Sequence, residues 1–140
     1  MLRNAALIVG SILISGCSQD PLYLGSWSAS AASIDNVEAP DPTGSLSVRE
    51  EGAELQVSWY FASTEETFDL AVGGDVVDRG DGSVDLEMDG RFTLTPKKGD
   101  ETSDVVEVSL DCDATESAMT CSGSLTGPSG SKVMDMQFAR

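Results

Sequence analysis

Apolar and polar residues alternate along most of the chain after Gly25, and clusters of Gly, Asp, Ser and Pro separate the alternating runs. Alternation with a period of two is typical of strands that bury one face and expose the other. We expect a first strand over residues 27–34 and a connecting loop over residues 36–43, which contains two prolines. No stretch after Gly25 has the apolar spacing of a helix, so the pattern predicts an all-β domain.

Matching the apolar faces across turns places the early strands. A two-residue turn over residues 51–52 would set Val48 opposite Leu55 and keep the apolar side chains of both strands on one face. The second strand should continue through Trp59, and residues 68–72 should return beside it on the same face.

The middle of the chain is rich in glycine and aspartate. Residues 73–82 are the least regular stretch, and we interpret them as a bulge or an elaborated loop. A three-residue turn over residues 88–90 would set Leu86 opposite Phe92. Gly90 would then adopt a left-handed conformation, and Gly90→Val should be costly because that conformation disfavours a side chain.

The late strands carry two of the three cysteines. If Cys112 lies opposite Cys121, Val108 meets Leu125, so the sulfur pair and the apolar faces agree on one register. A last hairpin should turn at residues 127–130. The inner face of the closing strand should carry Met134, Met136 and Phe138.

Short turns that join the strands in order predict a single small antiparallel up-and-down barrel of about eight to nine strands, whose closure removes exposed edges. A β-sandwich is the alternative, and a crossover in the loop over residues 36–43 would favour it. Residues 96–103 should form a charged loop. The residues expected to pack the interior are Trp27, Trp59, Phe61 and Phe92.

The N-terminal segment has a different pattern. Arg3 precedes an apolar run over residues 5–14, which is too short for a permanent membrane helix and is typical of a secretory signal peptide. The run ends in Ile14-Ser15-Gly16-Cys17, which resembles the lipobox of bacterial lipoproteins. In that family the signal is cleaved before the cysteine, which then carries acyl chains, so the resemblance implies lipidation at Cys17.

The lipobox also implies a division of the chain and a location. We expect a signal peptide over residues 1–16, a lipidated tether over residues 17–24 and a β-barrel domain over residues 25–140. Ser18 stands where lipoproteins retained in the inner membrane commonly carry Asp, which favours the periplasmic face of the outer membrane. Membrane lipid would be held through the covalent acyl chains on Cys17, and no other cofactor is expected.

Charge and residue counts narrow the possible functions. Cleavage removes Arg3 from the 8 basic residues and none of the 24 acidic ones, so the formal net charge moves from −16 to −17. Such a surface repels the phosphates of nucleic acid, so no nucleic-acid partner is expected. With Cys17 acylated in an oxidising compartment, we predict a disulfide between Cys112 and Cys121.

The chain has no histidine, which is the commonest general base and the commonest metal ligand. The acids over residues 85–89 mimic the start of a calcium-binding loop, but strand alternation explains them as a solvated face. We therefore expect neither an enzyme nor a metal site.

Gly25-Ser26-Trp27 opens the first strand. This triplet at the start of a meander resembles the Gly-x-Trp opening of lipocalin-type (calycin) barrels. In that family the tryptophan plugs one end of the barrel and a late arginine packs across it. The resemblance implies these barrel-closing roles for Trp27 and Arg140, with Gly25 beside them.

A similar compact barrel occurs in bacterial metalloprotease inhibitors and their outer-membrane lipoprotein members, whose free N-terminal tail enters the protease cleft. The sequence thus predicts a lipid-anchored, non-enzymatic envelope lipoprotein whose barrel binds an unidentified protein partner or small apolar ligand. A membrane-anchored protease inhibitor is the alternative. A cavity in the barrel would favour a small ligand, whereas a filled interior with a protruding loop at residues 73–82 would favour a protein.

Overall fold

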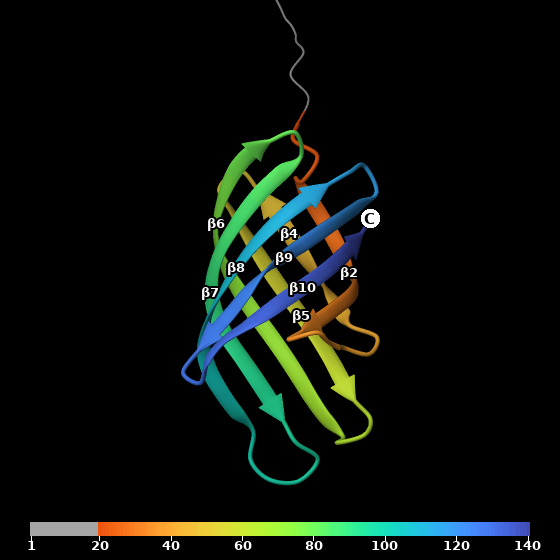
Figure 1. Cartoon of the computed structure of the whole chain (residues 1–140), viewed down its shortest axis with the longest axis vertical. Coiled ribbons are helices and arrows are strands. Elements are labelled where there is room, and N and C mark those ends of the chain that lie inside the picture. The colour runs from red at the N-terminus through yellow and green to blue at the C-terminus, as the bar shows by residue number, and fades with distance from the viewer. Residues whose placement is uncertain (1–19) are drawn as a thin grey trace, which may run out of the picture.

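The computed structural model describes residues 20–140, which form one antiparallel sheet. Its strands are β2 (Gly25–Ile34), β3 (Val37–Glu38), β4 (Thr43–Arg49), β5 (Gly52–Phe61), β6 (Glu66–Gly80), β7 (Ser83–Thr95), β8 (Thr102–Ala114), β9 (Ala118–Gly127) and β10 (Gly130–Ala139). Neighbours in the sheet follow the chain, and β10 also pairs with β2, which closes an 8-stranded barrel (Figure 1). The short β3 is an extra strand on the end of β2.

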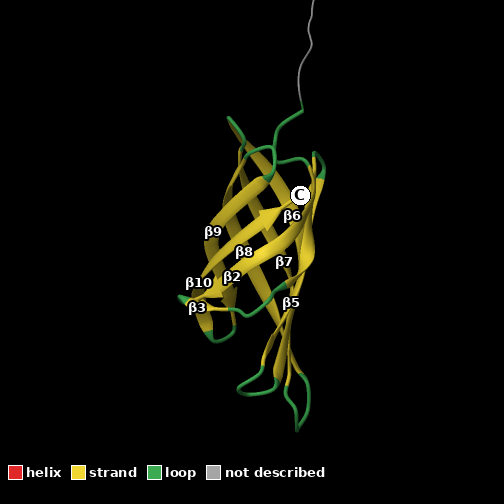
Figure 2. Cartoon of the chain, turned by 90° about the vertical axis from the view of Figure 1, so that its right-hand side faces the viewer, coloured by secondary structure: helices red, strands yellow, loops and turns green. Residues whose placement is uncertain are grey.

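The up-and-down barrel predicted from the sequence is therefore confirmed, and the β-sandwich is excluded. Within residues 20–140 all regular structure is strand, as Figure 2 shows. In the same part of the chain, no helix is long and apolar enough to cross a membrane. The loop predicted over residues 36–43 holds β3 in place of a crossover, because Val37 and Glu38 pair back onto the end of β2.

Alternating side chains build the core. In β8 the inward positions from Val106 to Cys112 are buried, while the positions between them are exposed. The predicted inner face of β10 is confirmed, since Met134, Met136 and Phe138 are each 1% exposed. Burying a side chain of this size stabilises the fold by about 1.5–3 kcal/mol. The largest fully buried side chains include Trp27, Leu46, Leu55, Leu70, Leu86, Leu110, Met119 and Phe138.

The late hairpin has the predicted register. Cys112 lies opposite Cys121 and Val108 lies opposite Leu125. The two sulfurs form a disulfide with an S–S distance of 2.05 Å. A bridge across a sequence separation of 9 stabilises the protein by about 3 kcal/mol in the loop-entropy account.

The first hairpin has the predicted faces in a different register. Leu46, and not Val48, lies opposite Leu55, and Arg49 pairs with Gly52. The turn therefore consists of the two residues before Gly52, which itself belongs to β5. The prediction is off by two residues, and a shift of two leaves every side chain on its original face.

Strand β6 runs through most of the stretch that the sequence assigned to a loop. Gly73 and Gly74 lie within the strand, and only the pairing between Asp78 and Gly80 is irregular. The bulge is thus present, but the elaborated loop is wrong. A Cβ on Gly74 would overlap the backbone carbonyl of Glu87, so glycine marks close approach of two strands at this position.

The hairpin predicted around Gly90 is also wrong. Strand β7 continues without a turn, and Gly90 pairs with Val72 on one side and Val106 on the other. Leu86 and Phe92 therefore lie along one strand on the same inner face instead of opposite each other. The φ angle of Gly90 is not positive. A side chain is excluded for another reason: a Cβ there would overlap the Ala71 carbonyl oxygen.

The rim of the barrel is uneven at the end farther from the N-terminus. The turn between β5 and β6 and the loop between β7 and β8 project beyond the turn between β9 and β10 (Figures 1 and 2). The charged loop between β7 and β8 covers residues 96–101, slightly less than the predicted 96–103, because β8 starts at Thr102. One wall of the barrel is consequently taller than the other at this end.

Residues 20–140 contain a closed sheet and a continuous core of their own. A unit with its own hydrophobic core and no unpaired long edge can fold alone. We therefore treat this body as able to fold without residues 1–19.

Gly90→Ala tests the cause of the glycine requirement. The added methyl group meets the Ala71 carbonyl, which belongs to paired backbone and cannot move freely, so we expect unfolding to become easier by about 2–3 kcal/mol. Gly127→Ala is the matched control, since its Cβ would lie 3.2 Å from a side-chain methyl of Val106 and at an ordinary 3.9 Å from the Val105 carbonyl oxygen. Urea denaturation followed by circular dichroism measures both, and equal losses for the two variants would contradict this explanation.

Candidate functional site

The two ends of the barrel differ in how they are closed. At the N-terminal end, the Arg140 guanidinium lies over the Trp27 ring, 3.9 Å from its centroid. It donates hydrogen bonds to the backbone carbonyls of Leu24 (2.7 Å), Leu22 (2.8 Å) and Glu116 (2.9 Å). This is the packing expected of Arg140 and Trp27 from the sequence. The side chain joins the first strand, the last strand and the turn between β8 and β9.

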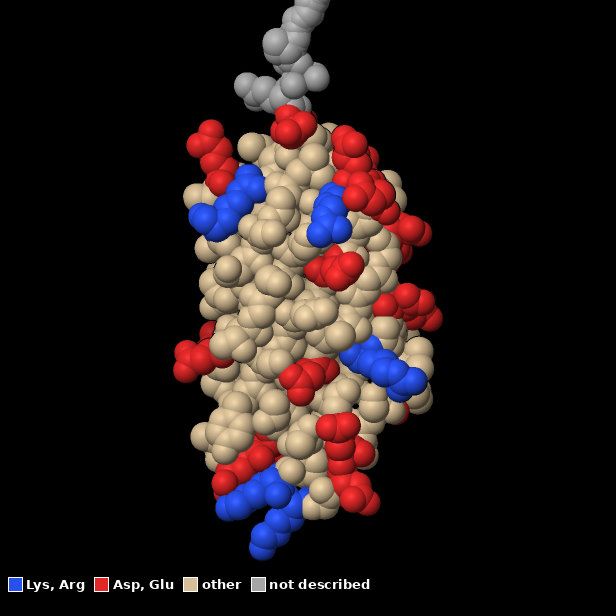
Figure 3. Space-filling view, turned by 180° about the vertical axis from the view of Figure 1, so that it is seen from behind, with Lys and Arg blue, Asp and Glu red and all other residues tan. Residues whose placement is uncertain are grey.

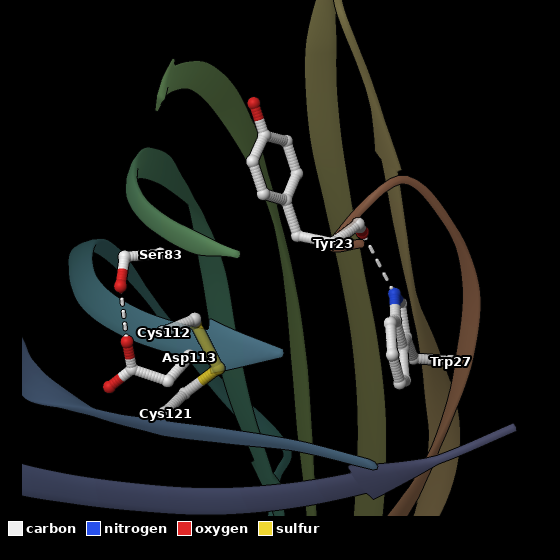
Figure 4. The surroundings of a disulfide bond; sticks show 6 residues. All are labelled: Tyr23, Trp27, Ser83, Cys112, Asp113 and Cys121. Atoms are coloured by element: carbon white, nitrogen blue, oxygen red, sulfur yellow. Dashed lines mark hydrogen bonds between the residues drawn. A yellow bond between two sulfur atoms is a disulfide. The ribbon is translucent and has the colours of Figure 1, made fainter. Parts of the chain in front are cut away.

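Gly25 and Tyr23 complete this plug. Gly25 has a φ of +123°, and a Cβ there would lie 3.1 Å from an Arg140 nitrogen, so the position requires glycine. The Trp27 indole nitrogen donates to the Tyr23 carbonyl at 2.9 Å (Figure 4). Burial and, after it, the negative charge of Asp78 raise the pKa of the Tyr23 phenol. This end of the barrel is therefore filled by side chains that pair with one another and with backbone carbonyls.

The opposite end carries a cluster of four aromatic side chains. Trp59 and Phe68 are stacked with ring centroids 5.9 Å apart, and Phe61 meets Phe68 edge-on at 5.1 Å. Phe92 lies 6.2 Å from Trp59 and 5.7 Å from Phe68. Strands β5, β6 and β7 supply these residues, so the cluster lines the taller wall of the barrel.

A cavity of about 350 Å³ opens beside this aromatic cluster. Ile34 and Ala39 border it from the β2 side, and Val106 and Leu125 form its floor against the core. Trp59 is buried, whereas Phe61 and Phe92 are only half-buried. Of the aromatic residues predicted to pack the interior, Trp27 and Trp59 are buried as expected. The other two, Phe61 and Phe92, line the mouth of the cavity instead.

Three charged residues stand at the rim of the cavity: Asp35, Asp104 and Lys132. Asp35 accepts a hydrogen bond from the Val133 amide at 2.9 Å and lies 3.6 Å from the Lys132 ammonium. Among residues 20–140, no described hydrogen bond or ion pair involves the Asp104 side chain. One carboxylate at the mouth therefore has no partner among the described residues.

The sequence reasoning missed Phe68 and Asp104 as parts of a site. Asp104 has the same parity as the buried Val106 and Val108, so alternation could have placed it on the inner face. The apolar side chains on the inner face of this strand begin only at Val106, so the apolar pattern alone gives no signal at Asp104. Phe68 was placed on the correct face, but its ring partners belong to neighbouring strands.

The remaining sequence candidates have separate locations. Cys112 and Cys121 form the disulfide near the plugged end (Figure 4). Cys17 lies outside the described residues, so its lipidation stays a prediction. In the part that the structure describes, no group of three or more His, Cys, Asp or Glu side chains is arranged to hold a metal ion. The three acidic residues within residues 85–89 alternate with the buried side chains of β7, so they lie on its outer face.

Arg140→Lys tests the plug. Lysine keeps the positive charge but cannot offer the planar fork that reaches three carbonyls and covers the indole, so we expect a loss of about 2 kcal/mol in unfolding free energy. Arg79→Lys is the control, because Arg79 makes an exposed ion pair with Asp85 that contributes little to stability. Thermal unfolding compares the two variants. If Arg140→Lys is as stable as the wild type, the Arg140 contacts do not stabilise this end of the barrel.

No protein-family model, no curated protein and no solved structure matches this chain. We therefore infer the function from the geometry of the two barrel ends.

Proposed function

We propose that this protein is a lipid-anchored lipoprotein of the bacterial cell envelope whose barrel binds a small apolar ligand at its open end, without catalysis. The observation that carries the proposal is the contrast between the ends. One is sealed by Arg140 over Trp27, and the other presents a cavity of about 350 Å³ beside four aromatic rings. Concave apolar sites of about 300–1,000 Å³ are typical of small-molecule binding.

The ligand site lies at the mouth and not in the middle of the barrel. The core beneath it is filled by large side chains such as Leu55, Leu86 and Leu110, each at most 1% exposed. A ligand would therefore insert one apolar end against the aromatic cluster and leave its other end near the rim. This favours a short chain or a single ring over a large lipid.

The anchor would orient this mouth away from the membrane. The described chain begins at Asp20, only three residues after Cys17, and it enters the barrel at the plugged end (Figure 1). The 13 residues of β7 rise about 3.3 Å each along a tilted strand, so the mouth would stand roughly 30 Å from that end. A lipoprotein on the periplasmic face of the outer membrane would thus offer its cavity to the periplasm.

The acidic surface favours a barrel that stands clear of the membrane. On the face shown in Figure 3, acidic residues are spread over the molecule and not gathered in one patch. A net charge of −16 repels anionic headgroups, so the barrel would stand clear of the bilayer and be held by its acyl chains.

Filling the cavity should abolish ligand binding. In Ile34→Trp the larger side chain would occupy the space beside the aromatic cluster, and we expect at least tenfold weaker binding of the neutral fluorescent probe N-phenyl-1-naphthylamine. Val133→Trp adds the same bulk on the outer face of β10, where Val133 is 53% exposed, and should bind as the wild type does. Absence of binding to the wild-type protein would refute the ligand site and would leave protein binding as the function.

The anchor is tested separately. In cells given radiolabelled palmitate, the full-length protein should take up label, and Cys17→Ala should lose it entirely because Cys17 is the acylated position. A variant of a different cysteine pair, Cys112→Ala with Cys121→Ala, should keep the label. Label that persists in Cys17→Ala would refute lipidation at Cys17.

A further inference from the structure

We propose that the ligand of the open end is a cationic amphiphile, an apolar chain or ring that carries an ammonium group, and that Asp104 receives its charge. This inference rests on the proposed function and names the chemistry of the ligand. The carboxylate of Asp104, the aromatic cluster and the cavity are adjacent at the mouth.

Asp104 is placed on the inner face of the barrel by its own strand. In β8, Val106, Val108 and Leu110 point inward and are buried, and Asp104 is two positions before the first of them. Its partner across to β7 is Phe92, a member of the aromatic cluster. A charge at the rim beside an aromatic floor is the arrangement that an amphiphile with one charged end would fill.

The other charges at the mouth already have partners. Lys132 is held 3.6 Å from Asp35, and Asp35 also accepts the Val133 amide. Asp104 is exposed and shares in neither contact. The rim thus offers one negative charge whose partner must come from outside the described residues.

Aromatic rings select the same sign of charge. The faces of Trp59 and Phe68 carry the negative lobe of their quadrupole, which attracts ammonium groups within about 6 Å of the ring centre and disfavours anions. The formal charge of −16 on the chain adds a long-range attraction for cations. The aromatic rings at the cavity and the net charge of the chain therefore both favour a cationic ligand.

An anionic amphiphile fits this mouth poorly. Among residues 20–140, Lys132 is the one cation that lines the cavity, and it would have to leave Asp35 to reach a carboxylate. The arriving carboxylate would also face the free charge of Asp104. Both effects lower the affinity for a fatty acid relative to an amine of the same length.

Three eight-carbon ligands test the proposal against the body formed by residues 20–140. Isothermal titration calorimetry at low salt and neutral pH would compare n-octylamine, n-octanol and n-octanoate. We expect octylamine to bind about tenfold more tightly than octanol, with octanoate the weakest, since an ion contact and a cation–π contact at a partly exposed site have this size. In Asp104→Asn, octylamine should lose most of its advantage over octanol, because only the cation–π contact remains, and octanol itself should be unchanged.

Asp111→Asn is the matched control, because it removes the same charge from an outward position of the same strand. Octylamine should keep its advantage in this variant. An equal loss in both variants would show that only the overall charge acts, and this would overturn a local role for Asp104.

The remaining outcomes separate the two proposals. If octanol and octylamine bind equally, the cationic ligand is refuted and the apolar site stands. If octanoate binds most tightly, Lys132 is the selective group and the inference is wrong. If none of the three binds while circular dichroism reports a folded protein, both the inference and the ligand site fail.

Discussion

The pairing of β10 with β2 is the constraint on which the rest of the structure depends. An open antiparallel sheet of this size would expose two long edges, and pairing the first and last long strands removes both. The register includes an irregularity between Gln137 and Phe138, after which Phe138 faces the core and Ala139 pairs with Ser28. Arg140 follows directly, so the closure itself delivers the guanidinium to Trp27.

Closure also makes the two ends unequal. At the plugged end the first and last strands and the disulfide lie close together, and the side chains of Trp27 and Arg140 fill the space. At the other end, β5, β6 and β7 continue past the shorter strands and carry large rings that have no facing wall. The cavity is the space that this difference in strand length leaves above a filled core. The proposed function depends on this difference between the plugged end and the open end.

The outer surface accepts a cost that the core does not. Like charges lie opposite each other on neighbouring strands, as with Asp85 and Asp111, and such pairs are destabilising by a few tenths of a kcal/mol. Ser109 donates to Glu87 and Ser83 donates to Asp113, which partly offsets that repulsion. A strongly acidic barrel is thus kept folded by its interior and its closure, and its surface charge remains available for attracting cations.

The inward faces of β4, β5, β8, β9 and β10 could be predicted from the sequence, because they depend only on a period of two. The predicted inward faces are correct for the hairpin at Gly52, although its register is off by two residues. The disulfide could be located because the cysteine pair and the apolar faces require the same register. The reason for glycine at positions 74 and 90 is visible only in the tertiary structure. A glycine in a turn and a glycine beneath a neighbouring backbone carry the same local signal, and the neighbour exists only once the sheet has closed. The cavity and the position of the Asp104 carboxylate beside it likewise depend on strand lengths that no single segment encodes.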